Sequence, residues 1–143
     1  MTYREVIKIG DSYLLPIISE LYELVGYKIT LVKAHDGGRN VVYRCEKEGA
    51  IAKIIRIAFL DDRNQDDFLA EVEYIRYLYE HGASVSNVIS SRNGNLLEEI
   101  TYDNHIFYIC VFERAKGKLL VENSYRYREG FHLPNIFITV VKH

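Results

Sequence analysis

A series of short strand-like segments separated by glycine turns constrains the fold of this chain more than any other feature. Residues 27–34 and 50–59 are rich in apolar and β-branched side chains, and residues 41–48 alternate in polarity, as strands do. Two glycines in residues 35–40, which read HDGGRN, separate the first two segments, and Gly49 separates the next two. Glycine turns between such segments are typical of hairpins, so the sequence predicts an antiparallel sheet.

Two further segments have the period of an amphipathic helix. Residues 64–81 carry Asp66 and Asp67 in the first turn, where acidic side chains favour the helix dipole, and end before Gly82. Residues 12–25 predict an N-terminal helix, with Ser12 as its N-cap and Gly26 as its stop.

More short strands are expected at residues 85–90, 96–101 and 105–113. The order of these elements predicts an α+β fold. We expect an antiparallel sheet of about five strands with one main packed helix and an N-terminal helix.

Composition narrows the class of protein. The 143 residues are 48% hydrophobic, which supports one domain with a core, and the net charge of −2 gives no reason to expect nucleic acid or an anionic membrane as partner. No apolar segment reaches the roughly 18 residues of a membrane span, and the start lacks the apolar core of a signal peptide. We therefore expect a cytoplasmic protein, with Cys45 and Cys110 as buried, reduced thiols. The histidines show no metal-ligand spacing.

Glu71 is the most informative position of the long predicted helix. At 100° per residue, the inner face holds Phe68, Val72, Ile75 and Tyr79, and Glu71 falls inside the same apolar arc. Glu73 and Glu80, near Arg76, are expected on the far side as a solvated charged face. A buried carboxylate is costly unless a cation or hydrogen-bond donors meet it. The alternative is that Glu71 lies at the rim of this face and reaches water.

The cation that would meet Glu71 should come from the strand at residues 50–59. Lys53 and Arg56 both interrupt its apolar sequence, and their spacing of three places them on opposite faces of the sheet. Only one of them can therefore face the helix or line a cleft. Either could instead be a strand-edge charge that reaches solvent.

The order of these features resembles a known family. A glycine turn, two strands, a basic residue and a helix with an inward glutamate are similar to the N-terminal lobe of protein-kinase-like enzymes. The details resemble the aminoglycoside phosphotransferase, choline kinase and homoserine kinase group. The segments that carry the resemblance, within residues 20–128, are DGGRNVVYR, IIRI, LAEVEYIRYL followed by HGASV, SRNGNLLE and FYICVFERAKGK.

This resemblance implies a binding site for ATP or GTP with Mg²⁺. The residues that match the phosphate loop are Gly37, Gly38, Arg39 and Asn40. The base contact is matched by Val42, and the phosphate contact by Arg56 with its partner Glu71. The hinge, which hydrogen-bonds the base, is matched by Phe112, Glu113, Arg114 and Ala115.

A second register remains open. Residues 50–53, Ala-Ile-Ala-Lys, resemble the Val-Ala-Ile-Lys motif of protein kinases and would make Lys53 the phosphate-binding residue. We favour Arg56, because the positions of Gly49 and of the following helix then keep the spacing of the family. A guanidinium can also grip a carboxylate through two hydrogen bonds.

The resemblance also implies what this chain lacks. Such kinases carry a catalytic aspartate and metal ligands in a C-terminal lobe, whereas the last aspartate here is Asp103, before the expected hinge. We expect residues 1–114 to form the nucleotide-binding lobe and 115–143 a linker and short tail, in a truncated chain that is inactive alone. The alternatives are a non-catalytic α+β interaction module and a degenerate fragment.

Association is expected where the second lobe would otherwise lie. Without that lobe, apolar residues of 107–112 and of the β-prone tail 131–141 would lack cover. A homodimer through the exposed sheet or the tail is therefore possible, and a tail folded back on its own sheet would keep the chain monomeric.

Overall fold

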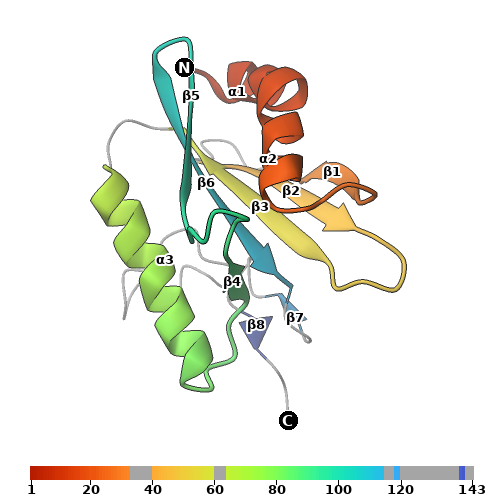
Figure 1. Cartoon of the computed structure of the whole chain (residues 1–143), viewed down its shortest axis with the longest axis vertical. Coiled ribbons are helices and arrows are strands. Elements are labelled where there is room, and N and C mark those ends of the chain that lie inside the picture. Colours follow the sequence, from red (N-terminus) through yellow and green to blue (C-terminus); the bar gives the residue numbers. More distant parts are fainter. Residues whose placement is uncertain (33–39, 60–63, 115–117, 120–138, 141–143) are drawn as a thin grey trace.

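The computed structural model describes residues 1–32, 40–59, 64–114, 118–119 and 139–140 (Figure 1). The arrangement is α+β, as predicted, with groups of consecutive strands before and after the long helix. In chain order they are α1 (Tyr3–Ile9), the π-helical segment η1 (Gly10–Leu14), α2 (Leu15–Leu21), β1 (Lys28–Val32), β2 (Asn40–Glu46), β3 (Lys53–Ala58), α3 (Gln65–Glu80), β4 (Asn87–Ile89), β5 (Glu98–Tyr102), β6 (His105–Glu113), β7 (Lys118–Leu119) and β8 (Thr139–Val140). Within the described residues, none of the helices has the length and apolar character of a membrane span.

The main sheet is antiparallel and has six strands in the part of the chain that the structure describes, against the five or so expected. Its order is β1-β2-β3-β6-β4, and β5 also pairs with β6. The long strand β6 lies beside β3 along one edge and shares its other edge between two short strands, with β5 at its start and β4 at its end. The short strands β7 and β8 pair with each other.

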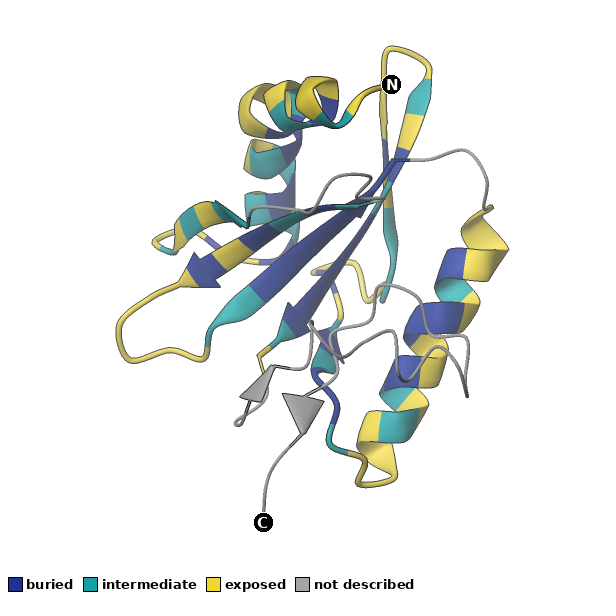
Figure 2. Ribbon diagram, turned by 180° about the vertical axis from the view of Figure 1, so that it is seen from behind, coloured by how far each residue is buried: buried dark blue, intermediate teal, exposed yellow. Residues whose placement is uncertain are grey.

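The sheet separates two apolar clusters. The larger cluster joins α1, η1 and α2 to one face of the sheet through residues such as Leu14, Ile18, Tyr43 and Ile57. The smaller cluster joins α3 to the other face through residues such as Val72 and Phe112. Figure 2 shows that the central strands are buried and that the N-terminal helices lie apart from α3.

The predicted N-terminal helix is wrong in its limits. Helical structure begins at Tyr3 instead of Ser12, because Thr2 and Glu5 form a capping box. Ser12 lies inside the helical segment, and its hydroxyl donates to the Lys8 carbonyl at 2.8 Å. The helix ends at Leu21, before the predicted stop at Gly26.

The long helix confirms the prediction closely. Asn64 caps α3 and exchanges hydrogen bonds with Asp67, and the helix ends at Glu80. Gly82 follows with a φ of +83°, a left-handed conformation that glycine adopts readily. The predicted 105–113 strand is also confirmed, and Asp103 and Asn104 turn into it with φ values of +48° and +64°.

Candidate nucleotide-binding site

A buried ion pair joins the central strand β3 to helix α3. The Arg56 Nη1 atom lies 2.5 Å from the Glu71 Oε1 atom, and the two side chains are only 3% and 6% exposed. The prediction that Glu71 points inward and pairs with Arg56 is therefore confirmed. The alternative of a water-exposed Glu71 at the rim is wrong.

Strand β6 supplies the other described neighbours of this ion pair. Cys110 is the cross-strand partner of Arg56, and the Arg56 guanidinium carbon lies 5.6 Å from the centre of the Phe112 ring. Burial works against the charge on Arg56, but the Glu71 carboxylate, through its charge and its hydrogen bond, favours the charged guanidinium, and the pKa of this group is raised. Burial also raises the pKa of the Cys110 thiol. The thiol is therefore neutral near pH 7, and Glu71 is the carboxylate that balances the cation.

Lys53 lies on the opposite face of the sheet. It is the cross-strand partner of Cys45, which belongs to the cluster beneath α1 and α2. Its ammonium group lies 5.2 Å from the centre of the Tyr27 ring, which suits a cation–π contact. Strand alternation thus separates the two candidate cations, and only Arg56 faces α3.

Two candidate residues on β2 share a face with Arg56. Val42 is directly opposite Arg56 in the β2–β3 register and packs, half-buried, against the α3-side cluster. Asn40 begins β2 and is the cross-strand partner of Ala58. An apolar side chain and a buried cation therefore lie next to each other on this face.

The expected hinge lies at the end of β6. Phe112 is fully buried and pairs with Ile54 on one side and Val88 on the other. Glu113 is half-buried and is the last residue of the strand, and the Arg114 amide donates to the Ala52 carbonyl at 2.8 Å. Gly37, Gly38, Arg39 and Ala115 lie outside the described residues.

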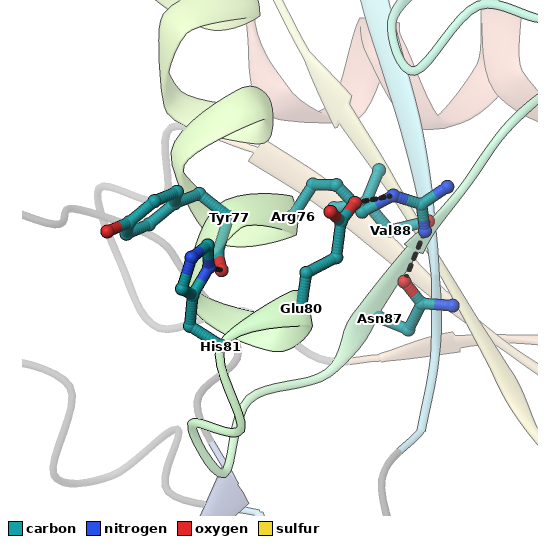
Figure 3. A network of polar contacts seen from close by, with 6 residues as sticks. All are labelled: Arg76, Tyr77, Glu80, His81, Asn87 and Val88. Carbon is teal, nitrogen blue, oxygen red and sulfur yellow. Dashed lines mark hydrogen bonds and ion pairs between the residues drawn. The ribbon is translucent and has the colours of Figure 1, made fainter.

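Sequence reasoning misplaced two residues of α3. Tyr79 was expected on the inner face but is 46% exposed. Arg76 was expected on a solvated charged face, but its guanidinium binds strand β4 (Figure 3). The position of β4 beside the helix decides this contact, and no local pattern in the sequence shows it.

No group of three or more potential metal ligands occurs among the residues that the structure describes.

The chain is similar in sequence and in fold to known small-molecule kinases. No protein-family model matches the chain. In sequence, it is 27% identical over 110 residues to an amicoumacin kinase of Bacillus subtilis (strain 168), a match that covers 76% of this chain and 32% of the relative. In structure, it matches an amicoumacin kinase in complex with AMP-PNP, Ca²⁺ and Ami with a TM-score of 0.66 at 26% identity, covering 87% of this chain and 37% of that one.

Two more distant structures share the fold. A microcompartment-associated aminopropanol kinase matches with a TM-score of 0.59 at 17% identity and covers 78% of this chain and 32% of its own. The spectinomycin phosphotransferase APH(9)-Ia, in complex with ADP and spectinomycin, matches with a TM-score of 0.55 at 13% identity, with coverages of 74% and 30%. The chain thus spans about a third of the length of the kinases it matches. Its similarity in sequence to one small-molecule kinase, and in fold to three, confirms the resemblance to the aminoglycoside phosphotransferase group that its motifs indicated.

Proposed function

We propose that this chain forms the nucleotide-binding lobe of a kinase that transfers the γ-phosphoryl group of ATP or GTP to a hydroxyl group of a small molecule. The buried Arg56–Glu71 ion pair is the single observation that carries the proposal. It holds a guanidinium in a fixed place on the α3 face of the sheet. The likeness to kinases that were solved with AMP-PNP or ADP supports it.

A buried ion pair contributes little net stability to a protein core. Removing two charges from water costs several kcal/mol per ion, and apolar residues of similar volume often stabilise a fold as well or better. Arg56 nevertheless stands in a strand where both neighbours, Ile55 and Ile57, are fully buried. A requirement for positive charge at this position explains the pair better than stability does.

The described residues fit a nucleotide in two respects. Arg56 supplies a positive charge for the phosphates, since a guanidinium presents five donors and matches phosphate geometry. Val42 supplies an apolar contact for the base beside it. Glu71 orients the guanidinium, and Asn40 begins the strand that follows the proposed phosphate loop of Gly37, Gly38 and Arg39.

The remaining roles complete the proposal. The backbone from Phe112 to Ala115 would hydrogen-bond the base, and residues 115–143 would act as a linker and tail after a lobe of residues 1–114. This lobe neutralises phosphate charge and positions the nucleotide, whereas the groups that bind Mg²⁺ and the acceptor would come from outside it. We therefore expect no phosphotransferase activity from the chain alone, and Mg²⁺-dependent transfer to an aminoglycoside or amino alcohol would contradict this.

Nucleotide titration tests the binding role. One wall of a cleft buries little of a base, so we expect weak binding of Mg-ATP or Mg-GTP, followed by NMR shifts of the amides in β2 and β6. Arg56→Met should abolish these shifts, and Lys53→Met, which changes the other face of the sheet, should preserve them. Equal shifts in Arg56→Met and wild type, or none in wild type, would contradict the proposal. Submicromolar affinity would show that a second wall is present.

A further inference from the structure

The guanidinium of Arg76 connects helix α3 to strand β4 through hydrogen bonds. Its Nη1 atom donates to Asn87 Oδ1 at 2.6 Å and to the Val88 carbonyl at 3.0 Å, and its Nε atom lies 3.3 Å from Glu80 Oε1 (Figure 3). The side chain of Glu80 is 61% exposed, so the contacts with β4 are the less solvent-screened part of this network.

The side chains of Arg76 and Glu71 project from different sides of helix α3. They are five residues apart, which at 3.6 residues per turn corresponds to an angle of about 140° around the axis and a rise of about 7.5 Å. Glu71 reaches β3 from one flank, and Arg76 reaches β4 from the other. Two anchors on different flanks resist rotation of a helix about its axis, which a single contact does not.

The strand that Arg76 holds runs beside the end of β6. Asn87 and Val88 are the cross-strand partners of Glu113 and Phe112. The same network therefore ties α3 to the part of the sheet where the base is proposed to bind. Arg76 therefore connects the position and rotation of α3 to the strand end where the base is proposed to bind. Because α3 also carries Glu71, the same contact bears on Arg56, the proposed phosphate contact.

We propose that Arg76 is a positioning residue for this site, a role that rests on the proposed nucleotide-binding function. It holds α3 at the rotation in which the Glu71 carboxylate meets the Arg56 guanidinium. Without it, the helix keeps its apolar contacts through Val72 and Ile75 but has freedom to turn, and the carboxylate no longer fixes the guanidinium in one orientation.

Arg76→Gln is the test variant, and Arg92→Gln is its matched control. Arg92 also pairs with a glutamate, Glu20, at 3.4 Å, but its side chain is 54% exposed, and both its guanidinium and its backbone amide bind residues of α2. The first readout is the Nε–H signal of Arg56 in a ¹H–¹⁵N NMR spectrum without nucleotide. We expect Arg76→Gln to shift this signal and speed its exchange with solvent, Arg76→Lys to do so less, and Arg92→Gln to leave it unchanged.

Nucleotide affinity is the second readout. In Arg76→Gln we expect a loss of affinity for Mg-ATP of roughly two- to thirtyfold, the range of coupling through such networks. In a Glu71→Gln background, the same change should have little further effect, because the carboxylate that Arg76 positions is already gone.

The two readouts separate the possible failures. If Arg76→Gln lowers the free energy of unfolding but leaves the Arg56 signal and the affinity unchanged, Arg76 only stabilises the fold and the positioning role is wrong. Equal losses of affinity in the wild-type and Glu71→Gln backgrounds would also overturn it. If wild type shows no response to nucleotide, the proposed function fails, and the Arg56 signal alone then decides whether Arg76 positions the ion pair.

Discussion

The two faces of the sheet differ in what they bury. The face beneath α1 and α2 carries the larger apolar cluster, where the Tyr43 hydroxyl donates to Asp11 at 3.3 Å. The face beneath α3 carries the smaller cluster and both charged side chains that are buried in the described residues, Arg56 and Glu71.

This difference separates the apolar packing that stabilises the fold from the residues proposed to bind nucleotide. Apolar burial contributes about 25 cal/mol per Å², so the continuous cluster of the first face is well suited to stabilise the fold. The second face gives up part of that contribution to hold a cation and a carboxylate. The same strand, β3, serves both faces, because its side chains alternate between them.

Breaking the ion pair should have the largest effect. Arg56→Met leaves the Glu71 carboxylate buried without its cation, so we expect the free energy of unfolding to fall by about 3–5 kcal/mol. Lys53→Met on the opposite face should cost about 0–1 kcal/mol, since Lys53 is only half-buried. Denaturant unfolding monitored by circular dichroism measures both.

A double variant sharpens this comparison. Arg56→Met with Glu71→Leu removes both charges, and it should be more stable than Arg56→Met alone because no unpaired charge remains. A damaging Lys53→Met together with a silent Arg56→Met would show that the other register is the correct one.

Overpacking the face beneath α1 and α2 should have an intermediate effect. A Cβ atom on Gly10 would lie 2.6 Å from the Tyr43 hydroxyl oxygen, although the helical φ of −57° suits any residue. We expect Gly10→Ala to lower the free energy of unfolding by about 1–3 kcal/mol through this clash.

Tyr43→Phe provides the control for that clash. Without the hydroxyl group, alanine at position 10 should cost little and could even stabilise, because its helix propensity exceeds that of glycine by about 1 kcal/mol. If Gly10→Ala costs the same in both backgrounds, the hydroxyl is not what requires glycine. Thermal unfolding of the two single variants and the double variant decides this.

The two cysteines, one on each face, should affect stability through their ionisation only at high pH. Burial raises the pKa of Cys45 from 9.0 to about 11, although Lys53 partly opposes this, and burial also raises the pKa of Cys110. The folded state therefore favours the neutral thiols. Their contribution to stability is complete below about pH 9 and is lost as the pH rises toward 11.

Unfolding measured at several pH values tests this expectation. The free energy of unfolding should fall between pH 9 and 11, with at most about 1.4 kcal/mol per pH unit from each thiol. Cys45→Ala should make the fall shallower, and an unchanged slope would contradict the assignment. Both thiols should react slowly with iodoacetamide at pH 8 until the protein is unfolded.

Local sequence signals predicted much of the fold. The helix that begins at the Asn64 cap, the strand that ends at Glu113 and the inward side of Glu71 were all visible in short-range patterns. The early start of the first helix has a local signal too, the Thr2–Glu5 capping box, although the apolar period that predicted a helix begins only at later residues.

Contacts between distant segments could not be predicted in the same way. The contact of Arg76 with β4 requires a strand placed beside the helix, and the need for glycine at position 10 requires the Tyr43 hydroxyl from β2. Neither partner lies close enough in sequence to leave a periodic signal.

The sequence by itself determined the class of fold, the main helix and the presence of one carboxylate on its apolar face, because these depend on periodicity and capping within a few residues. Only the tertiary structure decided which cation meets that carboxylate. The choice depends on the face toward which each side chain of β3 points and on the face that α3 covers. Strand alternation makes the two cations exclusive alternatives, and packing of α3 against the face that carries Arg56 selects between them.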